Sequence, residues 1–290
     1  MNNVDKKIED MVFSIFDTET TGDNKFLNDK PVEVAVVNWN LKKGFLGKPK
    51  SWLIDPKMII HPSAKAVHEI SDEMVKGKPL LEDILPEFHN YIDDNALIAH
   101  NIEFDLEMLP SLKERSNLKL DCLRFARKIY KIGDLGYKNQ DLRSHKSQEL
   151  RYWLNIKVDT MGLKAHRAAA DILVTGEVFS EILKKFLIQT KSTYMSELST
   201  FINSPMLIDK MTFGKFNGEK LEDCIAKECS KKNNYFFWLL KEVKSERMNI
   251  SADLKYSIEY YLKQNDIDLI GLFIDTPQKN WNNIAKMVNK

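Results

Sequence analysis

The stretch FDTETTG, residues 16–22, places two acids, Asp17 and Glu19, at the end of an apolar run. Successive side chains of a strand point to opposite faces, so a strand here puts both acids on the face of Phe13 and Ile15. An apolar face favours a core, whereas two buried carboxylates are costly without a positive partner. The pattern therefore predicts a divalent metal ion at this end of the strand, with further ligands elsewhere in the chain.

Two later acids interrupt apolar stripes at helical spacing. Asp105 lies three residues after Ile102 and four before Leu109, and Asp171 lies three residues after Ala168. A single acid on such a stripe is more often an edge residue than a ligand. If all four acids converge, they offer only carboxylate oxygens, which suit Mg²⁺ or Mn²⁺ rather than zinc.

A histidine, His166, precedes Asp171 by five residues, which is about 140° away on an ideal helix. We therefore expect His166 on the loop that enters the helix. A histidine beside a metal site is placed to take a proton from an attacking water near neutral pH. By itself, the residue would be interpreted as an ordinary surface histidine.

The elements expected around these residues form an α/β mixed sheet flanked by helices. Strands are expected at MVFSIFD, VEVAVVNW, KSWLID, ALIA and LKLDCL. The first three are joined by short loops and should be antiparallel neighbours. Helices are expected at HPSAKAVHEI, LLEDILPEFHNYI, HNIEFDLEML, SHKSQELRYWLNI and HRAAADILVTGEVFSEILKKFL.

The chain is expected to divide into a large domain and a small module. We place the domain at residues 1–190, a linker at 191–210, a compact α+β module at 211–265, and a tail without a readable role at 266–290. Inside the module, the Asn-Gly pair in MTFGKFNGEKLED predicts a two-residue hairpin, and YFFWLLKEV and SADLKYSIEYYLKQN predict helices.

The composition and charge argue against a polycationic protein, a secreted protein and a membrane-spanning protein. The 290 residues carry a formal net charge of +1, so a grip on nucleic acid would depend on a local basic surface or on metals. Three cysteines without zinc-type pairing suit a reducing compartment. The sequence lacks an apolar run long enough for a membrane span and a basic-then-apolar signal peptide, so we expect a cytoplasmic protein.

Three segments together resemble a known family. FDTETTG, HNIEFD (residues 100–105) and HRAAAD (residues 166–171) are similar to the three motifs of DnaQ-like 3′–5′ exonucleases of the DEDDh type, which share a ribonuclease-H-like fold. The resemblance implies a two-metal hydrolysis that releases nucleoside 5′-monophosphates. It assigns metal binding to the four acids, Asp17, Glu19, Asp105 and Asp171, and the general base to His166.

The second half of the chain narrows this resemblance. MTFGKFNGEKLEDCIAKECSKKNNYFFWLLKE is similar to the C-terminal region of the bacterial exodeoxyribonuclease X group, which implies action on DNA 3′ ends, single-stranded or at duplex ends, in repair or end processing. Contacts to the terminal nucleotide are expected from residues that follow or accompany the motifs: Thr20, Thr21, Gly22, His100, Asn101, Phe104 and Phe26.

Three alternatives stay open from the sequence. An RNA-trimming exonuclease of the same fold would have the same metal site, because the site contacts phosphate rather than the 2′-hydroxyl. A proofreading subunit would be held by a polymerase or repair partner. A catalytically silent nucleic-acid-binding adaptor is disfavoured, because all five motif residues are present.

Overall fold

The computed structural model describes residues 3–22, 28–229 and 234–265. The described chain divides into two compact units, with the boundary between Asn203 and Ser204. Among the described residues, no helix combines the length and the apolar character that a membrane crossing requires. The candidate residues that the structure describes belong to the first unit, which is therefore the one that positions the site.

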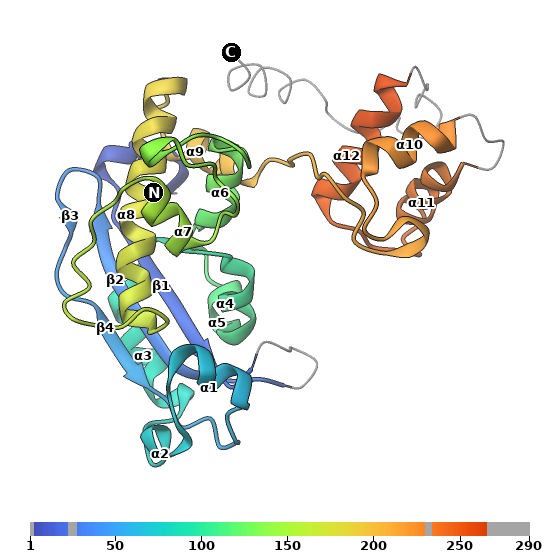
Figure 1. The fold of residues 1–290 in the computed structure, drawn as a ribbon. Helices are drawn as coiled ribbons and strands as arrows, with labels where there is room; N and C mark the ends of the chain where they lie inside the picture. The colour runs from blue at the N-terminus through green and yellow to red at the C-terminus, as the bar shows by residue number, and fades with distance from the viewer. Residues whose placement is uncertain (1–2, 23–27, 230–233, 266–290) are drawn as a thin grey trace. The chain divides into compact units, whose positions relative to one another are not determined.

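The first unit is built on a mixed six-stranded sheet (Figure 1). Its strands are β1 (Phe13–Thr20), β2 (Pro31–Asn40), β3 (Gly44–Phe45), β4 (Lys50–Leu53), β5 (Ala96–Ala99) and β6 (Lys119–Asp121). The order is β3-β2-β1-β5-β6, with β4 also pairing with β2. β1, β2, β3 and β4 pair as antiparallel neighbours, whereas β5 and β6 run parallel to β1. The predicted mixed sheet flanked by helices is thus confirmed.

Helices cover the sheet and connect its parallel strands. In the first unit they are α1 (Pro62–His68), α2 (Asp72–Val75), α3 (Leu81–Ile92), α4 (Ile102–Met108), α5 (Pro110–Lys113), α6 (Cys122–Ile129), α7 (Ser147–Trp153), α8 (Ala168–Thr190) and α9 (Met195–Asn203). Short 3₁₀ turns lie at Asn3–Asp5, Ile8–Asp10 and Tyr137–Asn139.

The two faces of β1 pack against different helices. Phe13 contacts Phe179 of α8, with ring centroids 5.4 Å apart. A glycine, Gly176, lets α8 approach this face closely, because a Cβ there would lie 2.9 Å from the Ile15 side chain. On the opposite face, Phe16 belongs to the core that α3 and α4 cover. Odd-numbered residues of β1 therefore face α8, and even-numbered residues face α3 and α4.

Two segments of the first unit differ from expectation. The strand expected at LKLDCL ends at Asp121, whose side chain accepts hydrogen bonds from the backbone of Leu123 and Arg124 and so caps α6. The stretch expected as a linker, residues 191–210, holds α9, whose apolar side chains are buried at helical spacing. Capping and tertiary packing therefore outweigh the local strand and linker patterns.

The second unit has its own core. Its helices are α10 (Leu221–Cys229), α11 (Tyr235–Lys244) and α12 (Ala252–Gln264), preceded by a 3₁₀ turn at Gly214–Phe216. The two-residue hairpin expected at Asn217–Gly218 is wrong: the backbone there closes a wider loop, with the single bridge between Lys210 and Lys220. Gly218 donates to the Met211 carbonyl and has φ +85°, a conformation that favours glycine.

Candidate active site

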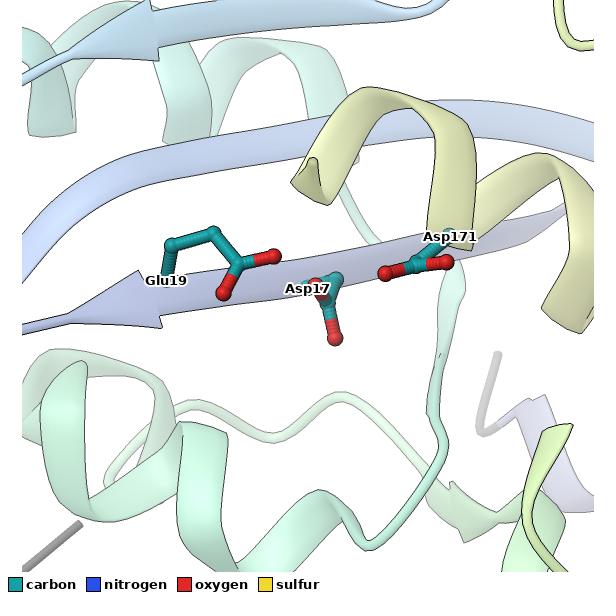
Figure 2. Close-up of side chains that lie close together, drawn as sticks. All are labelled: Asp17, Glu19 and Asp171. Atoms are coloured by element: carbon teal, nitrogen blue, oxygen red, sulfur yellow. The ribbon is translucent and has the colours of Figure 1, made fainter. Parts of the chain in front are cut away.

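Three carboxylates meet between β1 and the first turn of α8. Asp17 and Glu19 lie two residues apart on β1, so both face α8, and Asp171 comes from the start of that helix. One carboxylate oxygen from each of the three lies within 4.8 Å of the others. Figure 2 shows the groups of Glu19 and Asp171 on either side of Asp17. The small residues at Ala168–Ala170 are buried at this approach of helix to sheet.

The electrostatics of this cluster are those of acids forced together. Burial, and then repulsion from Asp105 and Glu19, raises the pKa of Asp17 well above its ordinary value. The pKa of Glu19 is raised to about 8, chiefly by burial and then by Asp171. Burial also raises the pKa of Asp171. Each carboxylate is therefore destabilised in its charged form until a cation joins it.

The donor set fits a hard divalent cation. The cluster offers only carboxylate oxygens, half-buried and close enough to share one ion. Mg²⁺ and Mn²⁺ prefer such ligands, while zinc sites in proteins usually include histidine or cysteine. The mutual repulsion of the acids would be relieved by the ion, so the residues present suit metal binding.

Asp105 lies next to this cluster, on the other side of β1. It is buried on α4, and its Oδ1 accepts hydrogen bonds from Thr18 through the backbone nitrogen at 3.0 Å and the hydroxyl at 2.8 Å. Burial raises its pKa to about 7, although the bonds from Thr18 act in the opposite direction. Its charge is nevertheless the strongest neighbouring charge acting on Asp17. The structure thus brings three of the four acids into one cluster and holds the fourth beside them.

A buried ion pair, not foreseen from the sequence, fixes the start of α8. Glu33 of β2 lies opposite Glu19 and is almost fully buried. Its two carboxylate oxygens accept from the Arg167 guanidinium at 2.9 and 3.1 Å, and one of them also accepts from the backbone nitrogen of Ala168 at 3.2 Å. Ser51 donates to the same carboxylate at 2.6 Å. The only signal in the sequence is an acid inside the apolar run VEVAVVNW.

His166 lies where the sequence predicts it, on the loop just before α8. Its side chain is exposed and its backbone has φ +59°. Both the imidazole charge and the backbone N–H of His166 act to lower the pKa of Asp171, which shows that the two residues are close. Gln148 of α7 adds a further polar contact, because its amide donates to the Asp171 carboxylate at 3.0 Å.

The end of β1 is held by internal hydrogen bonds. The Thr20 hydroxyl donates to the Gly22 carbonyl at 2.5 Å, and the Thr21 hydroxyl donates to Asp29 at 2.7 Å. His68 is buried, accepts from the Ile70 backbone at Nδ1, and so donates from Nε2 to the Thr20 carbonyl at 3.1 Å. These contacts shape the backbone beside the acids, while the predicted contacts of Thr20, Thr21 and Gly22 to a nucleotide stay predictions.

Three of the residues expected to surround the terminal nucleotide lie from the end of β5 into α4: His100, Asn101 and Phe104. His100 is in a turn and its Nε2 bonds the His145 carbonyl at 2.9 Å, while burial lowers its pKa. Asn101 is exposed with φ +79°, and Phe104 is half-buried one turn before the end of α4. Phe26 lies outside the described residues. Substrate contacts by this group therefore stay predictions.

Comparison with known proteins assigns this fold and site to a class. A family model described as "Exonuclease" (RNase T) matches residues 14–179, which is more than half of the chain. The match spans β1, α4 and the first part of α8, and so includes all the motif residues. The chain belongs to this exonuclease family, within the DnaQ-like group.

Individual relatives extend the similarity beyond the matched family range. The chain is 28% identical over 249 residues to exodeoxyribonuclease 10 of Escherichia coli (strain K12), covering 86% of this chain and 98% of that protein. It is 31% identical over 201 residues to DNA polymerase III subunit epsilon of Rickettsia conorii, covering 64% of this chain and 81% of the relative. A solved structure of exonuclease X in complex with 5′ overhanging duplex DNA matches with a TM-score of 0.50 and 28% identity, covering 64% of this chain and 99% of that one.

Proposed function

We propose that this exonuclease hydrolyses DNA from the 3′ end and releases nucleoside 5′-monophosphates. The observation that carries the proposal is the cluster of Asp17, Glu19 and Asp171, with Asp105 beside it, at the carboxyl end of β1. The similarity over 98% of exodeoxyribonuclease 10 supports DNA as the substrate. The likeness to exonuclease X bound to DNA supports the same assignment.

The four acids are proposed to hold two Mg²⁺ or Mn²⁺ ions. Asp17 lies between Glu19 and Asp171 (Figure 2). Asp105 is the strongest neighbouring charge acting on it, so Asp17 is placed to serve both ions. Bound divalent ions would neutralise the terminal phosphate and stabilise the charge that develops on the departing 3′ oxygen.

His166 is proposed to accept a proton from the attacking water. The exposed loop position lets the imidazole reach a nucleophile at the phosphate, and its closeness to Asp171 keeps the imidazole beside the acids. The water oxygen forms a bond to phosphorus, and the bond between phosphorus and the 3′ oxygen breaks. The terminal nucleotide leaves with its 5′-phosphate, and the shortened strand takes a proton from solvent at its new 3′-hydroxyl.

The role of His166 is tested by His166→Ala. A lost general base should reduce kcat by roughly 10²- to 10⁴-fold, while an exposed loop residue contributes little to folding. The thermal transition of the variant should match that of the wild type. Release of nucleotides at an unchanged rate would contradict the assigned role.

The choice of DNA over RNA is tested with matched oligonucleotides. The purified protein, supplied with Mg²⁺, should shorten a DNA strand from its 3′ end faster than an RNA strand of the same sequence. The experiment is needed because acids that contact phosphate do not distinguish the two sugars. Preferential shortening of RNA would overturn the DNA assignment. Labels at the 5′ and at the 3′ end establish the direction of degradation in the same experiment.

The division of labour between the parts of the chain is also a proposal. Residues 1–190, which include the matched family range, are assigned the hydrolysis. The module at residues 211–265 is assigned an auxiliary role in engaging DNA ends or a repair partner. The relationship to a DNA polymerase III subunit supports a test by co-purification with a polymerase. The tail at residues 266–290 lies outside the described residues.

A further inference from the structure

A cavity lies in the first unit, away from the acids. It has a volume of about 570 Å³ and is formed by the 3₁₀ turn Tyr137–Asn139, the end of α7 and the segment that follows it. Three cations, Lys138, Arg151 and Lys157, line it together with two tyrosines, Tyr137 and Tyr152. The cavity therefore combines positive charge with aromatic surface.

The cations of this cavity lack acidic partners in the described part of the chain. The Lys138 Nζ atom lies 5.2 Å from the centroid of the Tyr137 ring. The Arg151 Cζ atom lies 5.3 Å from the centroid of the Tyr152 ring. Arg151 Nε is buried and has no hydrogen-bond partner among the described residues. Leaving a buried charged N–H unpaired is unfavourable, so this atom is suited to a ligand that brings an acceptor.

The tyrosines of the cavity remain exposed. Tyr152 is 69% exposed and Tyr137 is 46% exposed. Large aromatic side chains at the surface, flanked by cations, provide stacking platforms for nucleic-acid bases. A purely structural role does not explain them, because the side chain of α7 that fills the core here is Trp153, which donates to the Asp134 and Gln140 carbonyls.

Helix α7 connects the cavity to the active site. Gln148 on its first turn donates to Asp171, and Arg151 and Tyr152 lie three and four residues later. Residues at these spacings share one face of a helix and are displaced by about 4.5 to 6 Å along its axis. A strand that ends at the acids and runs along α7 therefore meets the cavity next.

We propose that this cavity binds an unpaired nucleotide of the strand being degraded, upstream of its 3′ end. Its phosphate would contact Lys138, Lys157 and Arg151, and its base would stack on Tyr152 or Tyr137. The proposal rests on the proposed function for the identity of the strand. It explains how a chain with a net charge of only +1 concentrates positive charge where the strand leaves the acids.

The test compares strand lengths in two variants, the Lys138→Gln/Lys157→Gln double substitution and Tyr152→Ala. On single strands long enough to reach the cavity, KM should rise roughly tenfold in each variant. On a dinucleotide, kcat/KM should equal that of the wild type. Lys43→Gln and Tyr194→Ala serve as matched controls, because both residues are exposed near the opposite end of β1 and should leave every substrate unaffected.

Binding is measured separately from cleavage, by fluorescence anisotropy of a strand whose 3′-terminal linkages are phosphorothioates. For the double variant, the slope of log affinity against log salt should become shallower by about 0.7 for each lost phosphate contact. Unchanged affinity and slope, or an equal loss on the dinucleotide, would overturn the proposal. In a duplex with a 5′ overhang, the unpaired nucleotides belong to the strand opposite the recessed 3′ end. A loss of affinity that appears only when this overhang is present would overturn the assignment of the cavity to the degraded strand.

The two proposals fail in distinguishable ways. If the wild type cleaves no strand, but the variants bind the labelled strand more weakly than the wild type does, the hydrolytic function is wrong and the cavity is a nucleic-acid site. If the wild type degrades DNA and the variants behave as the controls do, the cavity proposal alone is wrong.

Discussion

Acidic side chains in the two units of this protein have opposite electrostatic surroundings. In the second unit, the Glu228 carboxylate is almost fully buried and accepts from Lys215 at 3.1 Å and from the Tyr235 backbone at 3.2 Å. In the first unit, Asp17 faces two other acids, and its pKa is raised by burial and repulsion. One acid thus has its positive partners inside the fold, and the other requires a partner from outside.

This contrast separates structural acids from functional ones. A buried carboxylate with a built-in cation and a backbone donor contributes to a specific fold without needing a ligand. A group of carboxylates that repel one another is retained at a cost in stability, which indicates a role beyond folding. Glu33 shows that both types occur within one site, because its partner Arg167 lies beside the acids that lack one.

The largest expected effect distinguishes these two types directly. Asp17→Asn removes one charge from the cluster, and nucleotide release should fall by roughly 10³-fold, which corresponds to the several kcal/mol that metal ions contribute to such reactions. In metal-free buffer, the same change should raise the melting temperature, because it relieves repulsion. A variant that keeps wild-type activity, or that loses stability without metal, would show that Asp17 is a structural acid.

The next effect concerns the ion pair that fixes α8. Arg167→Met leaves Glu33 buried without its cation and should lower the free energy of unfolding by about 3 to 5 kcal/mol. Chemical denaturation measures the change. Adding Glu33→Gln should recover part of the loss, because the unpaired charge is then gone. Strictly additive losses would mean that the contact between the two side chains carries no energy.

A smaller effect is expected in the second unit. Glu228→Gln keeps the size of the side chain but weakens its bonds to Lys215 and Tyr235, so the free energy of unfolding should fall by about 1 to 3 kcal/mol. Hydrolysis of a dinucleotide by the first unit should be unaffected. The opposite signs expected for Asp17→Asn and Glu228→Gln in metal-free buffer test the comparison, and two changes of the same sign would remove its basis.

The pH dependence of stability gives the most diagnostic effect. In the unfolded chain, the carboxyl groups have pKa values of about 4. In the folded protein, the pKa of Asp105 is raised to about 7 and that of Glu19 to about 8. The folded state binds more protons between these limits, so the stability of the metal-free protein should fall as the pH rises from about 4 to about 8.

Added Mg²⁺ should reverse this trend, because metal binding favours the charged acids. The rise in melting temperature caused by Mg²⁺ should therefore be larger at about pH 8 than at about pH 6. Scanning calorimetry with and without the ion measures both trends. Equal shifts at the two values, or a metal-free protein that gains stability with pH, would disagree with the raised pKa values.

The sequence predicted those parts of the site that depend on local periodicity. Alternation along β1 placed Asp17 and Glu19 on one face, and the helical stripe placed Asp171 opposite them. The loop position of His166 followed from its angular distance to Asp171. In each case, the spacing within one element determines the direction of the side chain.

The parts that escaped prediction depend on contacts between distant elements. Asp105 reaches Thr18 because α4 covers the even-numbered face of β1, which its own spacing does not reveal. The pair of Glu33 and Arg167 spans 134 residues and requires the register of β1 on β2. Local propensity favours a strand over residues 118–123. The cap at Asp121 starts α6 within this run instead.

The most direct test of the central claim is a calorimetric titration of the metal-free protein with Mn²⁺ at about pH 8, where Mn²⁺ stands for the hard divalent cations that such acids prefer. The wild type should bind two ions saturably, and Asp17→Asn should lose that binding while keeping its folded circular dichroism spectrum. Absence of saturable binding to the folded wild type, or equal binding by Asp17→Asn, would contradict a cation site formed by these carboxylates.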